Sequence, residues 1–132
     1  MIPTVTIMLI DDESINNFIS TKIIQQFNPR CNVIAYTRVK DALEHLQRED
    51  LPDLILLDIN MPGMNGWDFL DRYSEFTDSL QQRCPVVMLT SSVNQHDMQR
   101  SRGYRAVTGF ISKPLTVEAL EQMLCPQQRS SL

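Results

Sequence analysis

Short apolar runs alternate along the chain with longer stretches in which apolar and polar residues mix. Three runs are nearly continuous, which is typical of strands buried on both faces of a sheet: Val5 to Ile10 (VTIMLI), Leu54 to Leu57 (LILL) and Pro85 to Leu89 (PVVML). Two weaker strands are predicted at Asn32 to Tyr36 (NVIAY) and at Phe110 and Ile111. The pattern therefore predicts five strands.

The stretches between these runs have helical periodicity. The first helix has Ser14 as its predicted N-cap and Pro29 beyond its end, and its apolar residues are Ile15, Phe18, Ile19, Ile23 and Phe27. Four later helices are predicted: one runs through Ala42, Leu43 and Leu46, one starts with Trp67, Leu70 and Tyr73, one runs from about Asn94 to Arg102, and the last follows Thr116, which can cap it. Thr77 to Arg83 is predicted to be a helix extension or a surface loop.

Alternating strands and helices predict an α/β fold, a doubly wound parallel sheet with helices on both faces. The 132 residues fit one domain, 1–125, followed by a short polar tail, 126–132. A net charge of −4 argues against broad binding to nucleic acid or to an anionic membrane. The apolar stretch before Asp11 is too short for a signal peptide or a transmembrane span, so a cytoplasmic location is expected.

The three cysteines, Cys31, Cys84 and Cys125, are odd in number and widely spaced. This argues against a disulfide framework and against a zinc site, and favours buried or half-buried thiols. The histidines, His45 and His96, lie in polar helical stretches and are predicted to be surface residues. The arginines Arg100, Arg102 and Arg105 are predicted to form a solvated face.

Polar residues follow four of the predicted strands. Asp11 and Asp12 follow the first, Asp58 the third, Thr90 the fourth and Lys113 the fifth. The carboxyl ends of parallel strands share one edge of a sheet, where ligands bind, so these residues are expected to meet. Singly they have plainer interpretations, as turn or capping acids, a strand-end hydroxyl and a solvated lysine. Their joint placement favours a site.

Three neighbouring carboxylates repel one another unless cations balance them. Lys113 supplies one positive charge, and a divalent ion with hard oxygen ligands can cancel the rest. Magnesium suits a site made of few carboxylates, waters and a phosphate. Attack by Asp58 on a phosphoryl group needs a metal, a lysine and a hydroxyl donor around the spreading negative charge. Candidates for each of these parts are present.

Four segments, taken in order, closely resemble the receiver domain of two-component response regulators, the CheY-like family. They are LIDDE, LILLDINMPGMNGWDFL, VVMLTSS and FISKPL, and the resemblance extends from about Ile7 to Leu124. Each segment alone is weak, but their order and spacing are specific. The resemblance implies a flavodoxin-like sheet with the strand order 2-1-3-4-5.

The resemblance also implies roles for the acidic residues and their neighbour. Asp58 matches the phosphoacceptor, Asp12 the acid that binds Mg²⁺ directly, and Asp11 an acid that acts mostly through water. Asn60 matches the position whose backbone carbonyl binds the metal.

Four further residues have counterparts in the family. Thr90 matches the hydroxyl that moves to hold the phosphoryl group, and Lys113 the lysine that pairs with it. Phe110 matches the aromatic switch position, where relatives carry tyrosine or phenylalanine. Pro114 follows Lys113 as in the family, where that peptide bond is typically cis. Ser91 stands where most relatives carry alanine, so the lifetime of the phosphoryl group is expected to differ.

The resemblance implies a phosphorylation-dependent switch rather than an enzyme. The expected phosphodonor is a sensor histidine kinase or a histidine phosphotransfer protein. The expected output is contact with an unidentified downstream protein, with phosphorylation-linked dimerisation as a further option.

Two rival functions fit the sequence less well. A magnesium-dependent phosphatase of the haloacid dehalogenase-like class needs an Asp-x-Asp pair, in which the second acid donates and accepts protons. Here that position is Asn60, which cannot do so. A nucleotide-binding domain would need a Gly-rich fingerprint or a P-loop, which the sequence lacks.

Overall fold

The computed structural model describes residues 5–48, 51–59, 65–91 and 94–124. A five-stranded parallel sheet has the strand order β2-β1-β3-β4-β5, as the family resemblance implied. The strands are β1 (Thr6–Ile10), β2 (Asn32–Tyr36), β3 (Leu54–Asp58), β4 (Val86–Thr90) and β5 (Val107–Ser112). All five predicted strands are present, and β5 begins three residues before Phe110.

Six helices connect the described strands or follow the last one. They are α1 (Ser14–Phe27), α2 (Val39–Arg48), α3 (Gly66–Tyr73), α4 (Asp78–Arg83), α5 (Gln95–Ser101) and α6 (Val117–Leu124). None of them, within the ranges described, is long and apolar enough to cross a membrane. The segment predicted as a helix extension or loop is the separate short helix α4, which the Thr77 hydroxyl caps by accepting from the Leu80 amide at 3.3 Å.

The predicted caps have different outcomes. The Thr116 hydroxyl accepts from the Ala119 amide at 3.1 Å, so the predicted cap of α6 is confirmed. The prediction of Ser14 as the cap of α1 is wrong by one residue, because Glu13 occupies that position without a side-chain cap bond. The Glu13 amide is instead held by the Asp11 carboxylate at 3.0 Å, so Ser14 falls inside the helix.

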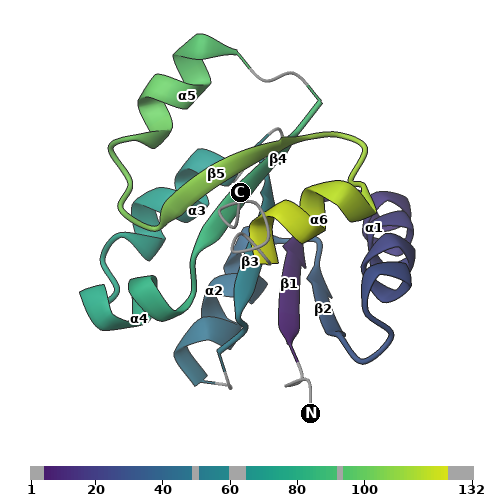
Figure 1. Cartoon of the computed structure of the whole chain (residues 1–132). Helices are drawn as coiled ribbons and strands as arrows, with labels where there is room; N and C mark the ends of the chain where they lie inside the picture. The colour runs from purple at the N-terminus through teal and green to yellow at the C-terminus, as the bar shows by residue number, and fades with distance from the viewer. Residues whose placement is uncertain (1–4, 49–50, 60–64, 92–93, 125–132) are drawn as a thin grey trace, which may run out of the picture.

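The sheet separates two hydrophobic layers (Figure 1). Helices α2 and α3 cover one face, over Met8, Ile55 and Met88. Helices α1 and α6 cover the other face, over Leu9 and Leu56. Neighbouring side chains along a strand point to opposite faces, so each strand contributes to both layers. The strand ends are therefore fixed from two sides.

Helix α1 is predicted correctly, but its apolar residues do not all face the core. Ile15, Phe18 and Ile19 are 59%, 58% and 50% exposed. The buried positions of the helix are instead Asn17, Ser20 and Ile24. The first half of α1 therefore turns polar groups inward and an apolar surface outward.

Candidate functional site

Polar side chains from four strands meet at the carboxyl edge of the sheet. Asp11 and Asp12 follow β1, Asp58 ends β3, Thr90 ends β4 and Lys113 follows β5. The three acids each offer a carboxylate oxygen, and these oxygens lie within 4.8 Å of one another. Asp11 and Asp58 are buried and Asp12 is half-buried. The structure thus brings the predicted acids into one cluster.

The Lys113 ammonium lies between two of these carboxylates. Its Nζ donates to Asp11 Oδ2 at 3.0 Å and lies 3.5 Å from Asp58 Oδ1. Burial acts to lower the pKa of Lys113, but the hydrogen bond with Asp11 and the negative charges of Asp11 and Asp58 outweigh it. The pKa therefore lies above its ordinary value. Lys113 is protonated at neutral pH and offsets one of the three acidic charges.

Asp11 is held by protein groups at every polar atom. Its amide donates to the Tyr36 carbonyl at 3.1 Å, and its carbonyl accepts from the Asn17 side chain at 3.0 Å. Its Oδ1 accepts from the Glu13 amide, and its Oδ2 from Lys113. Among the described residues, no hydrogen bond or ion pair involves the Asp12 carboxylate. Asp12 is therefore the more available of the two acids for a cation.

Thr90 and Phe110 lie on the same face of the sheet. Met88 and Thr90 pair with Phe110 and Ser112 in the β4–β5 ladder, so Phe110 is a diagonal neighbour of Thr90. Thr90 is 1% exposed, and its carbonyl accepts from the Lys113 amide at 2.7 Å. Phe110 is half-buried and packs against the layer covered by α2 and α3. The Lys113–Pro114 peptide bond is cis, as the family resemblance implied.

The N-terminus of α3 packs directly on the strand end that carries Asp58. The Gly66 amide donates to the Ile59 carbonyl at 3.1 Å. Asn65 and Asp68 form a capping box, in which the Asn65 side chain accepts from backbone amides and Asp68 accepts from the Asn65 amide. Asn60, which the resemblance implied as a metal ligand, lies outside the described residues.

The acidic cluster suits a small hard cation. Its donor atoms are carboxylate oxygens, and Lys113 leaves about two of the three negative charges unbalanced. Mg²⁺ prefers one or two carboxylates together with water and phosphate oxygens. Asp12 and Asp58 would hold such an ion, with Asp11 beside them.

Sequence reasoning missed one polar residue that supports this site. Asn17 is buried, and its side chain reaches the backbone of the acidic turn. The available signal was a second asparagine in a helix otherwise patterned by apolar residues. The apolar spacing instead indicated that the face with Ile15, Phe18 and Ile19 is the buried one.

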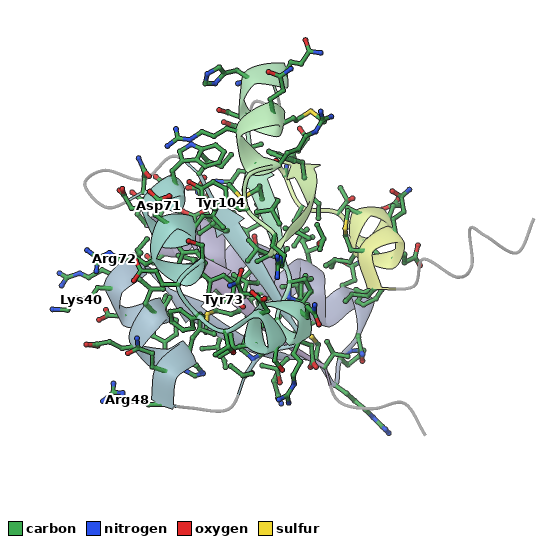
Figure 2. All side chains as sticks on the ribbon, turned by 90° about the vertical axis from the view of Figure 1, so that its left-hand side faces the viewer. Lys40, Arg48, Asp71, Arg72, Tyr73 and Tyr104 are labelled. Atoms are coloured by element: carbon green, nitrogen blue, oxygen red, sulfur yellow. The ribbon has the colours of Figure 1, made fainter. Side chains whose placement is uncertain are left out.

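A second set of missed contacts joins α5 and the loop after it to α3. The Arg100 guanidinium stacks on the Trp67 ring at 4.3 Å from its centroid, and the Tyr104 ring lies 6.0 Å from Trp67. The Tyr104 hydroxyl donates to Asp71, and Figure 2 shows these two side chains next to each other. Arg100, Arg102 and Arg105 are exposed, as predicted, and the stacking of Arg100 on Trp67 is an additional contact that the sequence did not indicate.

The remaining cysteine and histidine predictions have mixed outcomes. Cys31 and Cys84 are buried free thiols, as predicted, while Cys125 lies outside the described residues. His96 is an exposed side chain. His45 is half-buried, and its Nδ1 lies 2.7 Å from the Tyr36 hydroxyl.

An apolar groove of about 240 Å³ adjoins the acidic cluster. It lies between α1 and the segment after β5, and its lining residues are Asn16, Ile19, Ser20, Leu89, Lys113, Pro114 and Leu115. Lys113 belongs to both the groove and the cluster. Ile19, an exposed apolar side chain of α1, therefore lines a groove that reaches the Lys113 side of the cluster.

Known proteins share the fold of this chain. A two-component response regulator from Cytophaga hutchinsonii superposes with a TM-score of 0.84 at 30% identity, over 94% of this chain and 96% of that one. The sensor histidine kinase CheAY of Helicobacter pylori is 32% identical over 86% of this chain, which spans 14% of that protein. The response regulator Rre1 of Synechocystis is 31% identical over 99% of this chain, which spans 56% of it. The family model of the response regulator receiver domain matches residues 7–125. The chain belongs to this receiver family of two-component signalling.

Proposed function

We propose that the chain is a phosphorylation-dependent switch in which Asp58 accepts a phosphoryl group. The observation that carries the proposal is the cluster of three carboxylates at one sheet edge, two of which lie beside the Lys113 ammonium. A buried carboxylate beside a fixed ammonium and a candidate metal site has the surroundings that phosphoryl transfer requires. The fold alone would not support this conclusion, because one fold serves many functions.

In the proposed reaction, an Asp58 carboxylate oxygen attacks the phosphorus of a phosphohistidine. The phosphorus–nitrogen bond breaks, and its electron pair returns to the imidazole ring. The Lys113 ammonium and the Thr90 hydroxyl then hold phosphoryl oxygens of the acyl phosphate. Later a water oxygen attacks phosphorus, the bond to Asp58 breaks, and inorganic phosphate leaves with the carboxylate restored.

Asp12, Asp58 and the backbone carbonyl of Asn60 would hold Mg²⁺, with Asp11 contributing through water. The bound ion would supply positive charge opposite the phosphoryl oxygens. Asp11 would also orient Lys113, because its carboxylate accepts a hydrogen bond from the Lys113 ammonium and so holds the ammonium near Asp58.

The phosphodonor we propose is a phosphohistidine on a sensor histidine kinase or a histidine phosphotransfer protein, in the cytoplasm. The exposed side chains of Ile15, Phe18 and Ile19 on α1 would receive it, because Ile19 lines the groove that Lys113 shares with the cluster. Nucleic acid and membranes are not among the proposed partners, because the net charge of −4 disfavours broad binding to either.

Mass spectrometry after incubation with acetyl phosphate and Mg²⁺ tests the phosphoacceptor. The wild type should gain the mass of one phosphoryl group, and Asp58→Asn should not. Asp53→Asn is the matched control, because Asp53 lies just before the opposite end of the same strand, and it should be phosphorylated like the wild type. A phosphoryl group on Asp58→Asn, or none on the wild type, would refute the assignment.

The output we propose is a change at the face formed by α5, β5 and α6, which an unidentified downstream protein or a second copy of the chain would read. Thr90 would move toward the phosphoryl group, and Phe110 would follow into the space released, because the two are diagonal neighbours. Amide NMR spectra with and without beryllofluoride and Mg²⁺ test this. Shifts confined to the acidic cluster would contradict the coupling.

The chain would therefore act as a switch and not as a phosphatase. Some relatives that match it, such as the protein-glutamate methylesterase of Methylobacillus flagellatus, carry enzyme names, and the chain spans 30% of that protein. Incubation with p-nitrophenyl phosphate and Mg²⁺ separates the two functions. A switch gives no sustained release of nitrophenol, whereas a phosphatase turns over continuously.

A further inference from the structure

We infer that Asn17 is a positioning residue of the site, which sets the location of the metal-binding acid Asp12 through the backbone of Asp11. Asn17 lies in the first turn and a half of α1, and its side chain is turned into the protein. It does not belong to the acidic cluster itself. The inference rests on the proposed function, since it concerns the same cation.

The side chain of Asn17 joins three segments. Its Nδ2 donates to the Asp11 carbonyl at 3.0 Å and lies 3.5 Å from the Tyr36 carbonyl. The same Tyr36 carbonyl accepts from the Asp11 amide at 3.1 Å. Helix α1, the turn after β1 and the end of β2 are thus tied together at one amide group.

An asparagine buried at this position would lower the stability of the fold if its side chain made no hydrogen bonds. Asn17 is 6% exposed, and burial of an amide is unfavourable unless hydrogen bonds replace those with water. Asparagine is also a poorer helix former than alanine or leucine. The apolar side chains of Ile15, Phe18 and Ile19 in the same helix face outward, whereas the polar side chain of Asn17 is buried.

The consequence for the site follows from the chain order. Asp12 comes directly after the carbonyl that Asn17 holds, and its carboxylate is engaged by no other described residue. The backbone at Asp11 is therefore the main restraint on the distance between the Asp12 and Asp58 carboxylates. Loss of the Asn17 bond would widen the range of that distance and weaken binding of a cation that must touch both.

Two charge-matched variants test the inference. Asn17→Asp keeps the size of the side chain but replaces the donor with an acceptor that faces two carbonyl oxygens. Asn16→Asp adds the same charge one residue earlier on a half-buried side chain that contacts Glu13. Both variants add one negative charge at adjacent residues of α1, so Asn16→Asp controls for the added charge itself. Asn17→Ala removes the donor without adding charge and serves where Asn17→Asp does not fold.

The measurements are the dissociation constant for Mg²⁺ alone, by isothermal titration calorimetry, and the melting temperature without metal. Supporting groups around metal sites typically change affinity by about 10- to 100-fold. We expect Asn17→Asp and Asn17→Ala to raise the Kd by about tenfold or more relative to Asn16→Asp and the wild type respectively.

A merely structural role would lower the melting temperature of the Asn17 variants and leave the Kd for Mg²⁺ unchanged, and this result overturns the inference. A wild type that binds no Mg²⁺ at millimolar levels overturns the proposed metal site together with the inference. The two failures are distinguishable, because one shows in the wild type and the other only in the variants.

Discussion

The N-terminus of α3 approaches the end of β3 so closely that Gly66 has no room for a side chain. A Cβ at this position would lie 2.7 Å from the Asp58 carbonyl oxygen and 2.9 Å from the Ile59 Cα. Both are backbone atoms, which cannot rotate away as the end of a side chain can. We therefore predict that Gly66→Ala displaces either α3 or the strand end that carries Asp58.

The size of the effect follows from the overlap. Ordinary contact of a Cβ begins near 3.4 Å, so relief of the shorter contact requires a shift of roughly 0.7 Å. Overpacking of this kind costs about 1–3 kcal/mol, and the better helix propensity of alanine offsets at most about 1 kcal/mol. The net loss should be about 1–2 kcal/mol in the free energy of unfolding. For a domain of this length, that lowers the melting temperature by about 4–10 °C.

Urea unfolding and thermal melts measure this loss, and Gly103→Ala is the control. A Cβ at Gly103 would meet only the Arg100 carbonyl oxygen, at 3.5 Å, which is ordinary contact. Its free energy of unfolding should stay within about 0.5 kcal/mol of the wild-type value. Phosphorylation of Gly66→Ala by acetyl phosphate should also be slower, because Asp58 moves with the strand end. Wild-type stability together with a wild-type rate would refute the reasoning.

Three further results are expected. Mg²⁺ should raise the wild-type free energy of unfolding by mass action, by about 2.7 kcal/mol at a hundred times its Kd, and so raise the melting temperature. The response of Asp12→Asn should be much smaller, and equal responses would contradict the role of Asp12. Burial raises the pKa of the Cys84 thiol from 9.0 to about 11, so its contribution to stability is complete below pH 9.0 and is lost as the pH rises through about 11. Cys84→Ala should therefore flatten the alkaline fall in unfolding free energy measured with urea, and an unchanged slope would count against this. Arg100→Gln should cost about 0.5–1 kcal/mol and alter the fluorescence of Trp67, the single tryptophan; an unaltered emission spectrum would exclude the stack in solution.

The strands and the acidic cluster could be predicted because both depend on local pattern and chain order. Buried parallel strands are apolar on both faces, as Leu54 to Leu57 are, and the polar residues that follow them meet at the shared edge. The sequence indicated that Lys113 lies among the acids, but only the fold shows that its ammonium pairs with Asp11 and Asp58.

The orientation of α1 could not be read from its apolar spacing. Periodicity indicates a helix but does not say which face the core receives. Near the acidic turn, the surface that α1 covers consists of backbone carbonyls, which need donors rather than methyl groups. Asn17 satisfies that need, and Phe18 is left outside. Such a demand arises only once Asp11 and Tyr36 lie side by side.

The partition of the interior into two layers has a mechanical consequence. A rearrangement among the side chains beneath α2 and α3 reaches α1 and α6 through the backbone of the strands, because no buried hydrophobic residue in the described part of the chain belongs to both layers. Both layers border the acidic cluster at the carboxyl edge of the sheet, where Asp58 and Thr90 lie. Side-chain packing in the layer beneath α2 and α3 can therefore change while the layer beneath α1 and α6 keeps its packing, provided that the strand backbones stay in place.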